Sequence, residues 1–239
     1  FNKKIIFIIG LPRSGSSLVH QILASHSSVN GLGESSILNT FINNKILEEK
    51  FEKNLKYNNN INHEFLSDLS IYLGSEYENV SKNKISVDKS LFNFFWIGFI
   101  KVIFPKAKII HTTRNMEDTC FSIYKSLFGK NSVLWSYDKK NILKFISIYN
   151  DLLKFWSDKI PNYIYNLSYE SLINNQKKEI KKLLSFCELE WEENCINFYK
   201  NAPPIKSASL YQTRKPIYKS SIKQNLKYNS FINFGFEKS

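Results

Sequence analysis

The amino-acid sequence predicts an α/β fold with a central parallel sheet flanked by helices. Two observations support this prediction: short apolar runs alternate with longer helical segments, and the first run leads into a glycine-bearing loop. Residues 5–9 form an Ile-rich run ended by Gly10, which is typical of a strand buried on both faces. With 239 residues, 43% of them hydrophobic, the chain can bury one good core, so we expect a single domain over 1–239. Because the chain starts at Phe1 and its one methionine is Met116, we expect this domain to come from a longer parent chain.

The loop after the first strand, GLPRSGSS, has the composition of a phosphate site. A strand, a glycine-bearing loop and a helix expected over 18–25 bring backbone N–H groups together, and the helix dipole favours an anion there. The spacing of Gly10 and Gly15 matches the P-loop of nucleoside triphosphatases, but Ser16 stands where those proteins need Lys. The nearest cation is Arg13. The loop is therefore expected to bind a phosphate-type group for something other than ATP hydrolysis.

The stretch GLPRSGSSLVHQILASH resembles the 5′-phosphosulfate loop of PAPS-dependent sulfotransferases, in the branch that includes tyrosylprotein sulfotransferases and their bacterial relatives. The resemblance implies the P-loop-like three-layer architecture of that family. It also implies PAPS (3′-phosphoadenosine 5′-phosphosulfate) as the cofactor, PAP as its product, and no metal. Because PAPS carries a 3′-phosphate as well, a second anion site is expected elsewhere in the chain. The loop residues expected to bind the cofactor are Pro12, Arg13, Ser14, Gly15, Ser16 and Ser17.

Turn residues dominate 27–36 (SSVNGLGESS), which predicts a loop. This stretch contains Glu34, which can be interpreted as an acid near the start of a following helix. The resemblance gives it another role, because G-E-x-x resembles the position of the general base that deprotonates the acceptor hydroxyl. His111, at the end of a later strand, is the competing candidate for the base.

Helices are expected over 37–56 and 65–77, and the whole stretch 37–77 is interpreted as a helical insertion on the substrate side. A short buried strand over 84–88 follows, and Lys89 comes directly after it. A lysine at the carboxyl end of a central strand faces the ligand crevice of an α/β sheet. In the family a D-K or N-K pair here supplies a catalytic lysine, and the resemblance assigns that role to Lys89.

Arg114 and Ser122 form the predicted second anion site. A strand over 107–112 ends just before Arg114, and Ser122 lies in a helix expected over 116–128. An arginine fork and a hydroxyl can hold a phosphate together, and R-x7-S resembles the 3′-phosphate motif of the family. Many branch members carry a further Arg four residues after the Ser, where this chain has Ser126. We therefore expect 3′-phosphate binding to be weaker, or to be completed from elsewhere.

Tyr169 follows a strand expected over 163–167 and lies in a Y-E-x-L cluster. It is open to two interpretations: contact with the nucleotide, as the resemblance implies, or plain core packing. The remaining helices are expected over 91–104, 139–157, 176–187 and 191–200.

The stretch 203–228 is dense in hydrogen-bond donors, which by composition would suit a basic tail. Its pattern S-x-x-Q-x-x-K-P resembles the loop that folds over PAPS in tyrosylprotein-type enzymes. The resemblance assigns Ser209 as a catalytic serine, and Gln212 and Lys227 to the cofactor.

The formal net charge of +12 suits an anionic cofactor, an acidic substrate or nucleic acid, although the lysines are scattered along the chain. The three cysteines form no CxxC pair and no metal-ligand set, which predicts a reducing, cytoplasmic location. No run of 18 or more apolar residues occurs, so no membrane span is expected.

Together these motifs predict a sulfotransferase that moves the sulfuryl group from PAPS to a hydroxyl acceptor by in-line transfer. Glu34 is the expected base, and Arg13, Lys89 and Ser209 are expected to stabilise the developing charge. A protein tyrosine, a saccharide hydroxyl and a small alcohol all fit a carboxylate base, and the positive charge favours acidic peptides. The alternatives are a basic module that binds polyanions or nucleic acid, a P-loop-type small-molecule kinase, and a family member that binds PAP without turnover.

Overall fold

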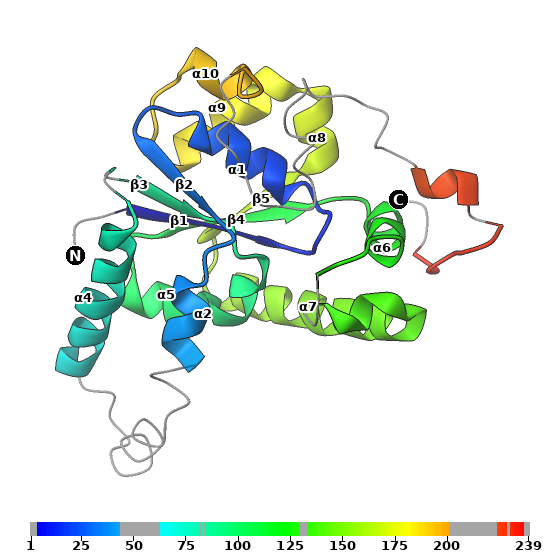
Figure 1. The fold of residues 1–239 in the computed structure, drawn as a ribbon, viewed down its shortest axis with the longest axis horizontal. Coiled ribbons are helices and arrows are strands. Elements are labelled where there is room, and N and C mark those ends of the chain that lie inside the picture. The colour runs from blue at the N-terminus through cyan, green and yellow to red at the C-terminus, as the bar shows by residue number, and fades with distance from the viewer. Residues whose placement is uncertain are drawn as a thin grey trace, which may run out of the picture.

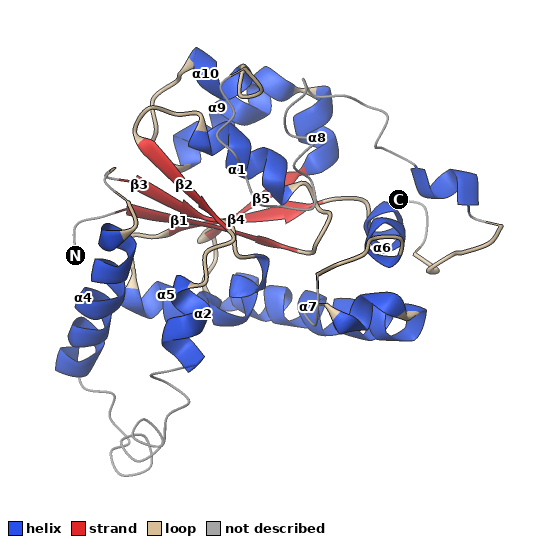
Figure 2. Ribbon diagram, in the orientation of Figure 1, coloured by secondary structure: helices blue, strands red, loops and turns tan. Residues whose placement is uncertain are grey.

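Five parallel strands form the centre of the molecule, in the order β2-β3-β1-β4-β5 (Figure 1 and Figure 2). Every neighbouring pair is parallel, so all the carboxyl ends of the strands meet at one edge of the sheet. The computed structural model describes residues 4–43, 63–81, 83, 85–129, 133–200, 224–228 and 230–236. The strands are β1 (Lys4–Gly10), β2 (Val29–Gly33), β3 (Ile85–Asp88), β4 (Lys108–Thr113) and β5 (Ile164–Ser168).

Helices cover both faces of the sheet, which confirms the predicted three-layer α/β architecture (Figure 2). One face carries α1 (Ser16–Ala24), α8 (Tyr169–Asn174), α9 (Gln176–Phe186) and α10 (Glu193–Ile196). The other carries α2 (Ile37–Phe41), α4 (His63–Asn79), α5 (Ile97–Ile103), α6 (Met116–Tyr124) and α7 (Lys139–Lys159). Within the described ranges, short 3-10 segments are η2 (Leu91–Trp96), η3 (Leu134–Tyr137) and η5 (Gln224–Tyr228).

The central strand β1 supplies both hydrophobic cores, because successive side chains of a strand point to opposite faces. Ile5, Phe7 and Ile9 pack with α4, α5 and α7, whereas Ile6 and Ile8 pack with α1 and α9. All five side chains are buried, as the Ile-rich run predicts for a strand that is covered on both sides. Within the predicted insertion, α4 also adds fully buried side chains to the first of these cores.

The expectation that 27–36 is a loop was wrong, because Val29–Gly33 forms the edge strand β2 and pairs with β3. Tertiary packing overrides the turn-like composition here. Gly31 lies so close to α1 that an added Cβ would stand 2.7 Å from both the Ala24 Cβ and the His20 Nε2. Only glycine fits this contact between the edge strand and the helix.

Several predicted helices are shorter than expected. The segment expected over 91–104 divides into η2 and α5, and the helix expected over 116–128 ends at Tyr124. There the Ser126 hydroxyl donates to the Ser122 carbonyl (2.7 Å), a local bond that competes with helix continuation. The helix expected over 191–200 is reduced to α10, because Glu192 is extended and accepts from the Ser27 N–H (2.9 Å).

Of the helix expected over 37–56, the described part is α2 and the two residues after it, and the rest lies outside the described residues. Among the helices that the structure describes, none is both long and apolar enough to cross a membrane.

Candidate active site

The glycine loop between β1 and α1 is the centre of the candidate site, at the carboxyl edge of the sheet. Gly15 precedes α1 with a φ of 96°, a left-handed conformation that favours glycine. An added Cβ on Gly15 would stand 2.5 Å from a ring carbon of Tyr169. The loop is therefore shaped by close approach to Tyr169, and Gly15 makes no side-chain cap at the start of α1.

Two hydroxyl groups anchor this loop to the neighbouring strand β4. The Ser14 and Thr112 side-chain oxygens lie 2.7 Å apart, and the Thr112 hydroxyl also donates to the Ile9 carbonyl (3.2 Å). Ser14, one of the residues predicted to bind the cofactor, thus has its hydroxyl buried inside the protein. The Ser14 backbone N–H also has a partner within the loop, because it donates to the Leu11 carbonyl (3.2 Å). The role that the structure gives Ser14 is to hold the loop in place.

The loop and the second predicted anion site are parts of one cluster. Arg13 Nε donates to the Ser122 Oγ (3.1 Å), and Arg114 Nη1 lies 3.4 Å from the Arg13 carbonyl oxygen. The Arg114 guanidinium lies over the Tyr169 ring, 5.0 Å from its centroid, and 3.7 Å from an Asp118 oxygen. The structure thus brings Arg13, Arg114, Ser122 and Tyr169 together, and it places Tyr169 beside the loop rather than in a core.

Lys125 is a further cation of this cluster that the sequence interpretation did not include. Burial, and then the positive charges of Arg13 and Arg114, lower its pKa from the usual value for lysine. Its ammonium group lies 4.8 Å from the centroid of the Phe121 ring. The signal was available, because Lys125 directly precedes Ser126, the position at which the expected arginine is absent.

Glu34 and Lys89 form an ion pair where β2 and β3 end. Lys89 Nζ lies 2.5 Å from Glu34 Oε1, and the two side chains are 1% and 56% exposed, respectively. The backbones are joined too, since the Lys89 N–H donates to the Gly33 carbonyl (2.8 Å). The Glu34 carboxylate is therefore exposed at the surface, whereas Lys89, its ion-pair partner, is buried.

Two buried titratable side chains, His20 and Asp88, lie close enough to this ion pair to interact electrostatically with Lys89. His20 Nε2 accepts a hydrogen bond from the Gly33 N–H (3.0 Å), and burial, then Lys89, lower the pKa of His20 to about 3. Asp88 accepts hydrogen bonds from the Tyr77 hydroxyl (2.7 Å) and the Ser90 N–H (2.9 Å). Burial raises the pKa of Asp88 to about 6.

The competing base, His111, is enclosed in the protein. Its Nδ1 lies 2.7 Å from Asn166 Oδ1, and its Nε2 is hydrogen-bonded to the Tyr149 hydroxyl. Burial lowers the pKa of His111. Because both ring nitrogens have protein partners, an acceptor hydroxyl would have to displace one of them.

The described part of the C-terminal segment, residues 224–228 and 230–236, lies against α6, the helix that carries Ser122. Carboxylates in the first turn of α6 accept its backbone N–H groups: Asp118 from Asn225 (3.2 Å), and Glu117 from Phe234 (2.6 Å) and Phe236 (3.2 Å). Lys125 Nζ also donates to the Gln224 Oε1 (3.0 Å). Of the residues predicted here, Lys227 is exposed in η5, whereas Ser209 and Gln212 lie outside the described residues.

The site contains cationic and carboxylate groups that could bind phosphate and move a proton. In the described part of the chain, no group of three or more His, Cys, Asp and Glu side chains could hold a metal ion.

The model of the Sulfotransferase family matches residues 6–193. An uncharacterized protein of Aquifex aeolicus (strain VF5) is 33% identical over 242 residues, which cover 97% of this chain and 31% of that protein. The chain thus spans less than a third of that relative. A putative protein-tyrosine sulfotransferase of Caenorhabditis briggsae is 22% identical over 203 residues, covering 83% of this chain and 70% of that protein.

Solved structures with a similar fold include the sulfotransferase domain of the Synechococcus PCC 7002 olefin synthase. Its TM-score is 0.62 at 16% identity, with coverage of 93% of this chain and 86% of that chain. A mouse sulfotransferase complexed with PAP gives a TM-score of 0.51 at 14% identity. The match covers 96% of this chain and 83% of the mouse chain. From the family match over most of its length, we conclude that this chain belongs to the sulfotransferase family.

Proposed function

We propose that this chain transfers the sulfuryl group of PAPS to a hydroxyl acceptor. The observation that carries the proposal is the arrangement at the carboxyl edge of the sheet. Three cations, Arg13, Arg114 and Lys125, gather on one side of the glycine loop. An exposed carboxylate, Glu34, is held by the buried Lys89 where neighbouring strands end.

The residues present fit a nucleotide with two separate anionic groups. The loop, with its left-handed Gly15 and the start of α1, suits the 5′-phosphosulfate. Arg114 and Ser122 suit the 3′-phosphate, and Lys125 supplies the cation that Ser126 does not. Lysine binds phosphate as a point charge, so Lys125, directly after α6, can take this role from one position earlier in the chain.

When bound, PAPS supplies a sulfuryl group on a phosphate leaving group. Glu34 takes the proton of the acceptor hydroxyl as that oxygen attacks, which is general base catalysis. Lys89 positions the Glu34 carboxylate beforehand and, with Arg13, stabilises negative charge near the sulfuryl group. Ser209, Gln212 and Lys227 complete this proposal as further donors to the cofactor from the C-terminal part of the chain.

For the acceptor, we propose a hydroxyl on an acidic molecule, and an acidic peptide with a tyrosine is the first one to test. A formal net charge of +12 attracts such a molecule at long range. Two relatives from Caenorhabditis carry the names of protein-tyrosine sulfotransferases, which supports the same choice. Saccharides and small alcohols serve as the comparison acceptors.

The proposal is tested first by calorimetric titration of the protein with PAP. We expect micromolar or tighter binding, weakened about 10- to 100-fold in Arg114→Ala and in Arg13→Ala, since a hydrogen bond to a charged group is worth about 1.5–3 kcal/mol. Lys154→Ala is the matched control, because this lysine is exposed on α7. No heat with PAP, together with salt-dependent binding to oligonucleotides, would instead favour a polyanion-binding module.

Turnover is tested with labelled PAPS and the acceptor panel. Glu34→Gln should retain PAP affinity and lose about 100- to 10,000-fold in turnover, the usual contribution of a general base. If the wild-type protein binds PAP and modifies no acceptor, it is a binding member of the family. If ATP is used in place of PAPS, the kinase alternative stands.

A further inference from the structure

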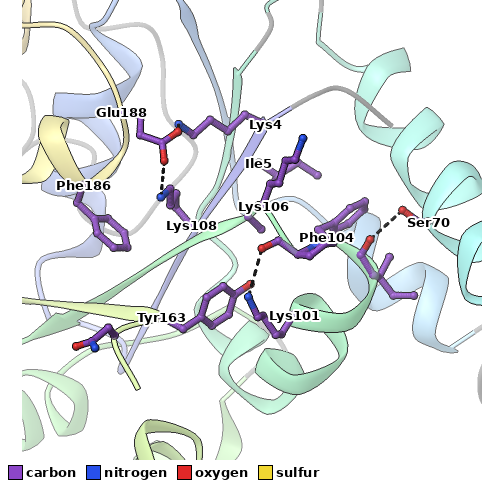
Figure 3. Close-up of a pocket in the computed structure, with 14 residues that line it drawn as sticks. Lys4, Ile5, Ser70, Lys101, Phe104, Lys106, Lys108, Tyr163, Phe186 and Glu188 are labelled. Carbon is purple, nitrogen blue, oxygen red and sulfur yellow. Dashed lines mark hydrogen bonds and ion pairs between the residues drawn. The ribbon is translucent and has the colours of Figure 1, made fainter. Parts of the chain in front are cut away.

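We propose a second ligand site, at the amino ends of the strands, that binds a small organic anion with an apolar body. A cavity of about 750 Å³ opens there (Figure 3). It is lined by residues from the starts of β1 and β4, from the ends of α5 and α9, and from the turn before β5. Because the strands are parallel, this is the sheet edge opposite the glycine loop. The six residues of β4 alone separate the two edges by roughly 20 Å.

The charge of the cavity points to an anion. Its lining contains four lysines and one carboxylate, a surplus of three positive charges: Lys4, Lys101, Lys106 and Lys108 against Glu188. Figure 3 shows Lys4 and Lys108 meeting at Glu188 on one side and Lys101 beside Tyr163 on the other. Like charges gathered in this way repel one another, and a bound anion would relieve that repulsion.

Glu188 acts as an internal counter-anion for only half of these cations. Its carboxylate oxygens lie 2.6 Å from Lys4 Nζ and 2.7 Å from Lys108 Nζ, and these two lysines lower its pKa to about 2. The backbone of Glu188 is left-handed, with a φ of 51°. Lys101 Nζ donates to the Pro105 carbonyl (3.4 Å) and lies 4.4 Å from the centroid of the Tyr163 ring. Neither Lys101 nor Lys106 makes an ion pair with the described residues, so their charges are not neutralised by a carboxylate there and can pair with an anionic ligand.

The other residues that line the cavity indicate the shape and polarity of the ligand beyond its negative charge. Ile103, Phe104 and Phe186 give the cavity apolar walls. The Tyr163 hydroxyl is buried and has no hydrogen-bond partner in the part of the chain that the structure describes. Burial raises the pKa of Tyr163 above its usual value, so this group stays an O–H donor. A flat apolar body with one phosphate or carboxylate group matches the walls, this donor and the two lysines.

The test uses 1-naphthyl phosphate as the probe and the neutral 1-methoxynaphthalene, which has no hydroxyl, as its partner, in calorimetric titrations without PAPS. We expect 1-naphthyl phosphate to bind, 1-methoxynaphthalene to bind at least tenfold more weakly, and saturating PAP to leave the binding unchanged. Lys101→Gln and Lys106→Gln should each weaken it up to about fivefold, the range of a partly exposed ion pair. Lys154→Gln is the matched control, since this exposed lysine does not line the cavity.

The Glu188→Gln variant should change the affinity for the probe in the opposite direction. Removing this carboxylate frees Lys4 and Lys108, so the probe should bind more tightly, by up to about fivefold. Displacement of the probe by PAP would overturn the proposal, as would lysine variants that bind like the control or a Glu188→Gln variant with unchanged affinity. The site does not depend on the proposed function, because neither its residues nor its probe enter the sulfuryl-transfer reaction.

Discussion

Two buried groups behind the Glu34–Lys89 pair should give folding stability opposite dependences on pH. Burial, then Lys89, lower the pKa of His20 from 6.5 to about 3, and burial raises the pKa of Asp88 from 3.8 to about 6. The variants His20→Gln and Asp88→Asn remove one titration each. Both variants have a side-chain oxygen that can accept the backbone N–H now bound by the native residue: Gln in place of His20 Nε2 for the Gly33 N–H, and Asn in place of Asp88 for the Ser90 N–H.

The sign of each effect follows from which state binds more protons. Below pH 6.5 unfolded His20 takes up a proton that the folded protein excludes, so stability falls as pH drops from 6.5 to 3. The shift corresponds to about 5 kcal/mol, at about 1.4 kcal/mol per pKa unit. Folded Asp88 instead keeps its proton up to about pH 6 and loses it on unfolding above 3.8. Its contribution therefore falls as pH rises through that range, by about 3 kcal/mol.

Between pH 4 and pH 6 the contributions of His20 and Asp88 to the pH dependence of the free energy of unfolding should nearly cancel. Each variant removes one contribution, so its stability curve shows the pH dependence that the other residue causes. Urea unfolding of the wild-type protein and both variants at half-unit pH steps measures this. The stability advantage of wild type over His20→Gln should shrink by about 3 kcal/mol from pH 6 to pH 4. Its advantage over Asp88→Asn should grow by a similar amount over the same steps. Stability curves of the variants that run parallel to the wild-type curve would refute the reasoning.

Three further changes test the geometry of the site. Gly15→Ala places a Cβ 2.5 Å from the Tyr169 ring, so PAP affinity should fall at least about tenfold, and unchanged calorimetric affinity would contradict the close contact. Glu117→Gln leaves one acceptor oxygen where Glu117 has two, so one of the two hydrogen bonds from the C-terminal segment is lost and limited proteolysis of that segment should be faster; equal rates would show that it is held by other contacts. Lys125→Gln should lower affinity for PAP about three- to tenfold and leave affinity for adenosine 5′-phosphate unchanged, whereas equal losses for both ligands would place this lysine away from the 3′-phosphate.

The sequence was sufficient where a motif lies within one strand–loop–helix unit. The apolar run ended by Gly10 predicted β1, and the glycine loop predicted the start of α1 to within two residues. Arg114 and Ser122 could be assigned to one region because both lie in the unit β4–α6, where the end of the strand and the first two turns of the helix are close together. Local periodicity contains this information.

The sequence was insufficient where tertiary contacts decide. Strand β2 was missed because its glycine-rich composition predicts a turn, whereas Gly31 is required by the close approach of α1. The binding of the C-terminal segment by α6 could not be predicted either, since its partners are more than 100 positions apart. Lys125 was missed for a simpler reason: the family motif places its further cation at position 126, where this chain has Ser126.

The strand order itself explains why the candidate site residues lie along one edge of the sheet. Glu34 and Lys89 follow the neighbouring strands β2 and β3, the glycine loop follows β1, and Arg114 follows β4. Along the carboxyl edge the groups therefore lie in the order carboxylate and lysine, loop, and arginine cluster. In-line transfer requires the attacking oxygen and the leaving phosphate on opposite sides of the sulfur. A sulfuryl group held at the loop would then have the proposed base on one side and the nucleotide cations on the other, an order that supports Glu34 over His111 as the base.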